Sequence, residues 1–196
     1  RDVEWRARLE SAGKRQASLV LENRARAQSG GPDLHYLFAP LKRSRLDYMV
    51  QKATELGVAL LQPVLTRHTI AERVNGDRMR ANVIEAAEQC GILRIPKIAA
   101  PERLDRALAS WDPARRLIFC DEGAPNADPI AALREVAPGS LAVLIGPEGG
   151  FAPEERDALV ALPFVVRIAM GPRIMRADTA AVAALTLVNA VLGDWK

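Results

Sequence analysis

Cysteine, histidine and aromatic residues are scarce in this sequence of 196 residues. It has two cysteines, Cys90 and Cys120, and two histidines, His35 and His68, while aromatic residues make up only 5% of the chain. Because no CxxC pair and no Cys/His ligand spacing is present, the composition argues against a disulfide scaffold and against a metal site. Both cysteines lie in apolar stretches, so we expect reduced core residues within a core of Ala, Leu, Val and Ile.

Long apolar runs are also absent. The most apolar segment, residues 179–192, is too short to cross a bilayer, and no signal peptide is visible. We therefore expect a cytoplasmic protein with no membrane partner. The chain begins at Arg1 within a pattern of alternating residues and without a preceding turn. We expect the natural N-terminus to lie further upstream and the first strands to lack their partner strands.

Positive charge is concentrated near the N-terminus. Residues 1–45 hold ten Lys or Arg against five Asp or Glu, whereas residues 46–196 hold seventeen against nineteen. A basic face of this kind can attract a phosphate backbone. A solvated surface with no partner gives the same composition, and the charge alone favours that second interpretation.

The order of the elements predicts two parts. Alternation over residues 3–10 and 16–24 predicts an antiparallel hairpin, and the linker AQSGGPD at 27–33 predicts a domain boundary. Beyond it, apolar strands alternate with helices, which is typical of a parallel sheet covered on both faces. The expected strands are 35–40, 59–66, 116–120, 141–146 and 164–169, and the expected helices are 44–56, 76–90, 127–136, 153–162 and 177–192.

Three loops that follow strands have unusual sequences: CDEGAPN (120–126), GPEGGF (146–151) and MGPRIMRADT (170–179). Ligands of open α/β sheets bind beyond the carboxyl ends of the strands, so neighbouring strands would bring these loops into one site. The glycines of GPEGGF permit close backbone approach. Glu148 and the absence of a nearby lysine argue against a triphosphate, and both glycine-rich phosphate motifs are missing. A tight turn with no ligand fits the spacing equally well.

Arg173 and Arg176 are the charged residues of an otherwise apolar stretch in the third loop. Each needs an anion or a carbonyl partner. Pairing with Asp178 or Glu148 would satisfy them within the protein, and a bound ligand would satisfy them equally. The helix that follows is apolar nearly all round, so we expect it to be buried in the core or at a subunit interface.

GPEGGF followed by MGPRIMRADTAAVAAL closely resembles the C-terminal signature of SPOUT methyltransferases. Specifically, it resembles the RsmE type, which methylates N3 of one uridine in 16S ribosomal RNA. KRSRLDYMVQKATELGV at 42–58, IEAAEQCG at 84–91 and IP at 95–96 agree with it, so the likeness covers about residues 35–195. One departure is Asp178, because the family usually has Glu before the corresponding Thr.

The resemblance implies a fold and an assembly. Residues 34–196 would form a SPOUT methyltransferase domain, an α/β fold with helices on both faces of a parallel sheet and a C-terminal trefoil knot made by the three loops. Residues 1–30 would be the remnant of a small PUA-like β-barrel that binds RNA. The enzyme would be a homodimer with the last helix partly at its interface, and its partner would be 16S ribosomal RNA or the small ribosomal subunit.

The resemblance also implies S-adenosylmethionine as the cofactor, held among the loops. A side chain added at Gly149 would then fill the adenosine space. The residues expected to bind the cofactor are Cys120, Asp121, Glu122, Ile145, Gly146, Pro147, Gly149, Gly150, Met170, Gly171, Ile174 and Met175.

For catalysis, the expected residues are Arg176, Thr179 and Glu148. Arg176 would stabilise negative charge on the uracil with Thr179 as a helper, and Glu148 would orient its loop. The general base is not identified, with Asp178, Asp121 and Glu122 as the other carboxylates to test. RNA contacts are expected from Lys42, Arg43, Arg45, Arg67, His68 and Arg173.

Three alternative functions remain open at this stage. One is a methyltransferase of the same fold that acts on another RNA position. Another is a ribosome-assembly factor that binds RNA without turnover, against which the intact glycine loop and Arg176 argue. The third is a small-molecule α/β enzyme, against which the basic hairpin and the lack of a Ser/His/Asp constellation argue.

Overall fold

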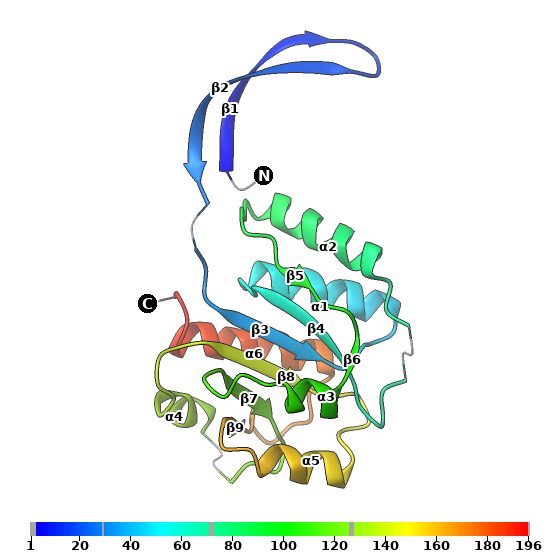
Figure 1. The fold of residues 1–196 in the computed structure, drawn as a ribbon, viewed down its shortest axis with the longest axis vertical. Coiled ribbons are helices and arrows are strands. Elements are labelled where there is room, and N and C mark those ends of the chain that lie inside the picture. The colour runs from blue at the N-terminus through cyan, green and yellow to red at the C-terminus, as the bar shows by residue number, and fades with distance from the viewer. Residues whose placement is uncertain (1–2, 29, 71–72, 126–127, 196) are drawn as a thin grey trace.

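A computed structural model describes residues 3–28, 30–70, 73–125 and 128–195. Its two parts are a long hairpin and an α/β body (Figure 1). The hairpin pairs β1 (Val3–Ala12) with β2 (Ala17–Ala27) in antiparallel register, as the sequence predicts. Ser29 of the predicted linker lies outside the described residues, as do Asn126 of the first predicted loop and Ala127 at the predicted start of a helix.

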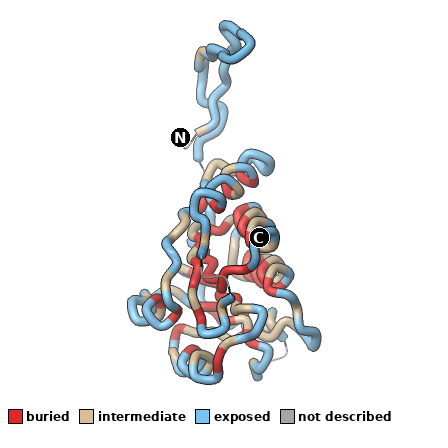
Figure 2. The backbone as a smooth tube through the Cα atoms, turned by 90° about the vertical axis from the view of Figure 1, so that its right-hand side faces the viewer, coloured by how far each residue is buried: buried red, intermediate tan, exposed pale blue. Residues whose placement is uncertain are grey.

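The hairpin projects from the body and is exposed along almost its whole length (Figure 2). Its large apolar side chains, Trp5, Leu9, Leu19 and Leu21, are each about half exposed or more. Three register shifts interrupt the pairing and therefore the simple alternation of side chains between the two faces. Arg26 contacts the body, where its Nη2 donates to the carbonyl oxygen of Gly91 at 2.7 Å.

The body contains a seven-stranded sheet whose described strand pairs are all parallel. The order is β5-β4-β3-β8-β7-β9, and β6 also pairs with β4. The predicted parallel sheet is confirmed. The strands are β3 (Leu34–Phe38), β4 (Leu60–Leu65), β5 (Lys97–Ile98), β6 (Glu102–Arg103), β7 (Arg116–Cys120), β8 (Leu141–Ile145) and β9 (Val165–Ile168).

Helices follow most of the strands, and the first two helices end at a glycine. Gly57 and Gly91, with φ of +76° and +62°, follow the first two helices as expected. Asn75 caps the second helix by accepting from the amide of Arg78 at 3.0 Å. The helices are α1 (Arg43–Glu55), α2 (Gly76–Gln89), α3 (Leu104–Ala109), α4 (Pro129–Arg134), α5 (Pro153–Val160) and α6 (Ala177–Val191). The short β5, β6 and α3 were not predicted.

Each face of the sheet has its own core. Along β8, Val143 and Ile145 point to the face covered by α1, α2, α4 and α6, while Ala142 and Leu144 point to the face covered by α3 and α5. This alternation explains why the central strand is apolar at every position. Helices on both faces are therefore confirmed. No described helix has both the length and the apolar character to cross a membrane.

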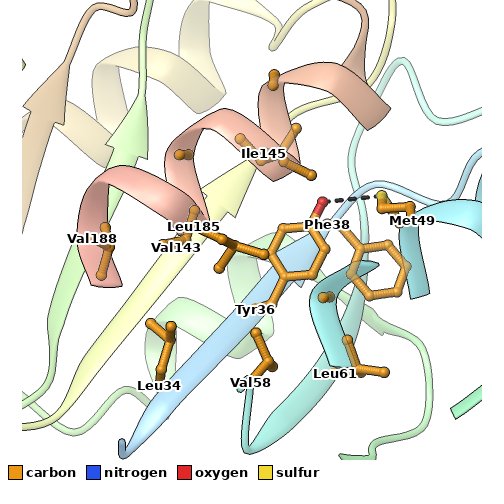
Figure 3. Packing of buried hydrophobic residues seen from close by; sticks show 14 of the residues in the cluster. Leu34, Tyr36, Phe38, Met49, Val58, Leu61, Val143, Ile145, Leu185 and Val188 are labelled. Atoms are coloured by element: carbon orange, nitrogen blue, oxygen red, sulfur yellow. Dashed lines mark hydrogen bonds between the residues drawn. The ribbon is translucent and has the colours of Figure 1, made fainter. Parts of the chain in front are cut away.

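The larger core is packed around β3 (Figure 3). Tyr36 and Phe38 stack with ring centroids 5.1 Å apart, and the buried Tyr36 hydroxyl donates to Sδ of Met49 in α1 at 3.0 Å. Leu185 and Val188 of α6 cover the same face. Burying one such aliphatic side chain contributes about 2 kcal/mol, so α6 is held mainly by its apolar contacts.

The two cysteines have different environments. Both are free thiols, as expected. Cys120 at the end of β7 is half-buried, but Cys90 is exposed at the end of α2. The prediction that both are core residues is therefore wrong for Cys90. The reason is that Cys90 follows the last turn of its helix, where the amphipathic period no longer directs a side chain to the core.

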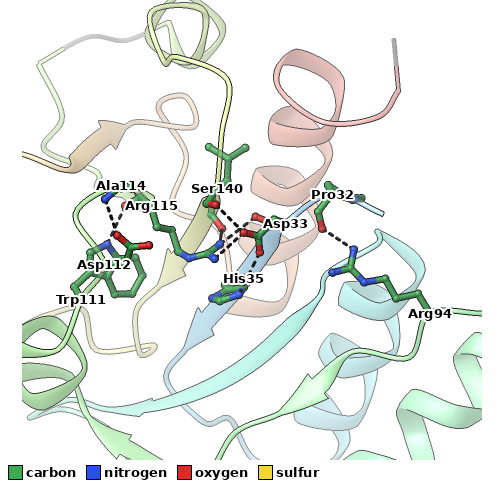
Figure 4. Close-up of polar contacts among 10 residues, drawn as sticks. Pro32, Asp33, His35, Arg94, Trp111, Asp112, Ala114, Arg115 and Ser140 are labelled. Atoms are coloured by element: carbon green, nitrogen blue, oxygen red, sulfur yellow. Dashed lines mark hydrogen bonds and ion pairs between the residues drawn. The ribbon is translucent and has the colours of Figure 1, made fainter. Parts of the chain in front are cut away.

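A polar cluster joins the amino ends of β3, β7 and β8 (Figure 4). Arg115 donates to the Asp33 carboxylate at 2.8 Å and to the carbonyl oxygens of Asp33 and Leu141 at 3.1 and 3.0 Å. The Ser140 hydroxyl donates to the same carboxylate at 2.7 Å. The hydrogen bond from Arg115 lowers the pKa of Asp33, against the opposing effect of burial. The cluster thus fixes the sheet at the end opposite to the three predicted loops.

His35 lies beside this cluster, and we predict that it makes stability fall in mild acid. Burial, followed by the positive charge of Arg115, lowers its pKa from 6.5 to about 4. Between these two values the unfolded chain binds a proton that the folded chain does not, so stability decreases as pH falls from about 6.5 to about 4. Urea unfolding at a series of pH values measures this slope.

His35→Gln should remove that part of the slope. His68→Gln, which removes an exposed histidine, is the control and should keep it. An unchanged slope in His35→Gln would contradict the assignment.

Candidate functional site

The three predicted loops lie together because their strands are neighbours. β8, β7 and β9 are consecutive in the sheet and parallel, so their carboxyl ends meet at one edge. The segments that follow them enclose a cavity of about 520 Å³. This volume is within the range of pockets that bind small ligands and cofactors.

The cavity has apolar walls and a polar rim of backbone and charged groups. Its lining contains the apolar side chains Phe119, Ile145, Phe151, Ile168, Met170, Ile174, Met175, Ala177 and Ala180. The other lining residues are Cys120, Asp121, Glu122, Gly123, Gly146, Pro147, Glu148, Gly150, Gly171, Arg156, Arg173 and Arg176. Of the residues expected to bind a cofactor, Gly149 is outside this lining. Thr179, one of the expected catalytic residues, is also outside it and is exposed in the first turn of α6.

Each glycine of the GPEGGF loop has a different role. Gly150 has a φ of +72°, which favours glycine, and its amide closes a turn onto the carbonyl oxygen of Pro147 at 2.9 Å. A Cβ at Gly146 would lie 2.4 Å from the ring of Phe151. A Cβ at Gly149 would instead lie 3.6 Å from Cβ of His68, an ordinary contact. The geometry therefore gives no support to the expectation that a side chain at 149 fills ligand space.

Glu148 is paired across the loop with Arg45 of α1. His68 Nδ1 is 3.0 Å from the carbonyl oxygen of Gly150, and the Arg67 amide donates to Glu155 of α5 at 2.8 Å. Three of the basic residues expected to bind RNA therefore contact the segment that follows β8. Lys42 and Arg43 are exposed at the start of α1, and Arg173 lines the cavity.

Arg173 and Arg176 have no carboxylate partner among the residues that the structure describes. Glu148 is taken by Arg45, and Asp178 Oδ1 accepts from the amide of Thr179 at 3.0 Å. The two intramolecular pairings considered from the sequence are thus not formed. Arg176 is the residue that precedes α6, where the helix dipole adds positive character. This part of the cavity is suited to a ligand that carries negative charge or carbonyl oxygens.

Asp121 is held by two arginines that the sequence analysis did not select. Arg156 donates to its two oxygens at 3.0 and 3.1 Å, and Arg167 donates to Oδ2 at 2.7 Å. Burial by itself would raise the pKa of Asp121, but these hydrogen bonds and that of the Gly123 amide outweigh it and lower the pKa. A carboxylate so firmly ionised and so fully hydrogen-bonded is a poor proton acceptor.

One of these arginines left a signal in the sequence. Arg167 interrupts the apolar strand FVVRIA, and a charged residue in such a strand needs a partner. Arg156 lies in an ordinary charged helix and gave no signal.

Cys120 and the metal-binding residue types offer no further reactive group within the described part of the chain. Burial raises the pKa of the Cys120 thiol to about 12, so this cavity residue is a neutral thiol and not a nucleophile. No cluster suited to a metal ion occurs in the described ranges.

A parallel sheet whose carboxyl-end loops surround a partly apolar cavity is the arrangement by which α/β domains bind nucleoside-sized ligands. Comparison with known families gives a narrower assignment than this structural class. A family model described as RNA methyltransferase domain matches residues 29–189, and the chain belongs to this family. The resemblance found in the sequence motifs is thereby confirmed.

Individual relatives agree with the family. The chain is 27% identical over 193 residues to ribosomal RNA small subunit methyltransferase E of Rickettsia conorii, covering 96% of this chain and 77% of the relative. It spans 62–63% of the length of relatives with the same name in Synechocystis and two Buchnera strains.

Solved structures agree as well. A methyltransferase of Legionella pneumophila, solved with bound S-adenosylmethionine, is 28% identical with a TM-score of 0.82, covering 98% of this chain and 81% of that one. The Neisseria gonorrhoeae methyltransferase E, at 24% identity and a TM-score of 0.85 over 97% of this chain and 79% of that one, has the same fold.

We predict that Gly146→Ala destabilises the protein by about 1–3 kcal/mol because Phe151 must move. That ring packs edge-on against Phe119, with centroids 5.2 Å apart, so it has little room to move. Gly149→Ala in the same loop is the matched control, since its Cβ meets only ordinary contacts. Urea unfolding of both variants measures the difference, and equal free energies of unfolding would contradict the packing argument.

Proposed function

We propose that the protein uses S-adenosylmethionine to methylate N3 of one uridine in 16S ribosomal RNA. The observation that carries the proposal is the cavity between the three loops, whose lining contains Arg176, a residue with no carboxylate partner among those that the structure describes. Membership in the RNA methyltransferase family and the names of the relatives support the same reaction class.

The cavity residues fit the proposed cofactor. Apolar side chains such as Ile145, Met170 and Ile174 offer walls for an adenine ring, while the backbone groups of Gly146, Pro147 and Gly171 in the same lining would meet polar groups of the cofactor. The Legionella relative, whose structure contains this cofactor, supports the assignment. When bound, S-adenosylmethionine would supply a methyl group activated by a positively charged sulfur.

Arg176 has the central chemical role in this proposal. Uridine N3 carries a proton and becomes a good nucleophile only as that proton leaves, which places negative charge on the uracil carbonyl oxygens. A guanidinium with no carboxylate partner can donate to those oxygens and stabilise that charge. Thr179 would assist from the first turn of α6, and Arg173 would contact RNA phosphate.

Glu148 would orient its loop and not bind the sulfonium directly. Its ion pair with Arg45 supports this role, because a neutralised carboxylate stabilises a positive ligand less. That difference matters since the sulfur loses its charge during transfer. A strongly attracting carboxylate would stabilise the ground state more than the transition state.

The assembly is part of the same proposal. Residues 1–30 would belong to a PUA-like RNA-binding β-barrel, and residues 34–196 would form the methyltransferase domain with its loops threaded as a trefoil knot. The hairpin exposes the apolar side chains of Trp5 and Leu21, which supports the proposal that this surface packs against other strands of such a barrel. We further propose a homodimer in the cytoplasm, with Lys42, Arg43, Arg45, Arg67 and His68 on the side that meets RNA.

The direct test uses small ribosomal subunits that lack the modification and S-adenosylmethionine with a labelled methyl group. After incubation, the RNA is digested and its nucleosides are identified by mass spectrometry. We expect labelled 3-methyluridine at one position. A different methylated nucleoside would redirect the proposal to another RNA position, and cofactor binding without any transfer would indicate a non-catalytic RNA-binding factor.

Arg176→Ala should lower kcat by about 100-fold or more while leaving cofactor affinity nearly unchanged. The reason is that its donors act on charge that develops only in the transition state. Arg173→Ala is the matched comparison, removing an equal charge from the same loop. It should raise KM for RNA more than it lowers kcat. Wild-type turnover in Arg176→Ala would remove the residue from the mechanism.

A further inference from the structure

One cluster beside the cavity has no role in the chemistry described so far. Asp121 follows β7, Arg156 belongs to α5, and Arg167 belongs to β9. Asp121 and Arg156 line the cavity, whereas Arg167 lies behind them and is outside the lining. The cluster therefore joins the three segments whose loops form the site. The connection is made by side-chain hydrogen bonds and not by backbone hydrogen bonds between strands.

We propose that Arg156 and Arg167 are positioning residues that hold the loop of residues 121–123 in the shape that binds S-adenosylmethionine. This inference rests on the proposed function. It assigns the two arginines to cofactor affinity and not to the transfer step.

The hydrogen bonds support a clamp with two arms. Each guanidinium contacts both the carboxylate of Asp121 and the carbonyl oxygen of Gly123. The Gly123 amide also donates to Asp121 Oδ1 at 3.0 Å. The loop is thereby fixed at two backbone groups and one side chain. Planar guanidiniums are suited to such paired contacts in a way that an ammonium group is not.

Burial makes the loss of both arginines more costly than the loss of one. The Asp121 side chain is only 5% exposed, while those of Arg156 and Arg167 are 37% and 22% exposed. Removing one partner of a buried ion pair leaves a charge that is poorly compensated. With one arginine lost, the other still neutralises Asp121, but with both lost the carboxylate must move toward water and take the loop with it. The double substitution should therefore raise the Kd for the cofactor by a factor larger than the product of the two single factors.

Gly123 allows the clamp to be disturbed without any change of charge. A Cβ at this position would lie 2.5 Å from Nη2 of Arg156. Its φ is not in the left-handed region, so alanine adds no backbone strain there. Gly123→Ala should displace the Arg156 guanidinium alone and mimic part of the arginine loss.

The test measures affinity for S-adenosylmethionine by isothermal titration calorimetry, with steady-state kinetics on ribosomal subunits. Arg156→Gln and Arg167→Gln should each raise Kd and KM for the cofactor about tenfold. The double variant should raise them by more than the product of the two. Because the clamp does not touch the reacting atoms, kcat at saturating cofactor and KM for RNA should change by less than about twofold.

Controls separate the clamp from general electrostatics and from unfolding. Arg134→Gln removes the same charge from the exposed side of α4 and should leave affinity unchanged. Arg156→Lys keeps the charge without the planar fork and should bind as weakly as Arg156→Gln. If urea titrations show that the double variant is unfolded, the cofactor affinity of Gly123→Ala still tests the clamp without a change of charge.

The outcomes distinguish this inference from the proposed function. Wild-type affinity in the arginine variants and in Gly123→Ala, with the unaltered protein binding normally, would overturn the clamp and leave the proposed function intact. Wild-type cofactor affinity in Arg156→Lys would show that the clamp does not need the planar guanidinium of Arg156. A lack of binding by the unaltered protein would overturn the cofactor assignment and this inference with it.

Discussion

The position of β8 between β3 and β7 is the constraint on which the rest of the structure depends. It pairs with both in parallel, and β7 in turn pairs with β9. Parallel pairing brings the carboxyl ends of these strands to one edge, so loops far apart in sequence become walls of one cavity. The apolar run of β8 makes this possible, because a strand buried on both faces is stable only at the centre of a covered sheet.

Both ends of this sheet are tied by the same kind of interaction, with different consequences. At the amino ends, Arg115 binds the Asp33 carboxylate and the backbone carbonyl oxygens of Asp33 and Leu141. At the carboxyl ends, Arg156 and Arg167 bind Asp121. The first cluster acts on the stability of the strand ends. The second reaches the cavity wall, so its geometry bears on ligand binding as well.

The charges around the cavity are divided into paired and unpaired groups. Glu148 and Asp121 each have arginine partners, whereas Arg173 and Arg176 have no carboxylate partner in the part of the chain that the structure describes. A site arranged in this way presents cationic donors to its ligand and neutralises two of its three lining carboxylates, Asp121 and Glu148. That arrangement suits a reaction in which negative charge develops on a nucleic-acid base.

The order of the main strands and helices could be predicted from the sequence, because short apolar runs, helical periodicity and the glycines at 57 and 91 are local signals. The loops that line the cavity could also be predicted, since each contains glycine and charged residues and follows an apolar strand. β5, β6 and α3 were missed because they contain only two to six residues each, too few to show a period.

Which side chains meet depends on the tertiary structure. It placed Gly149 against His68, paired Glu148 with Arg45 and joined Arg156 to Asp121 across 35 positions. Such contacts depend on the order of the strands in the sheet, and no local pattern of residues encodes that order.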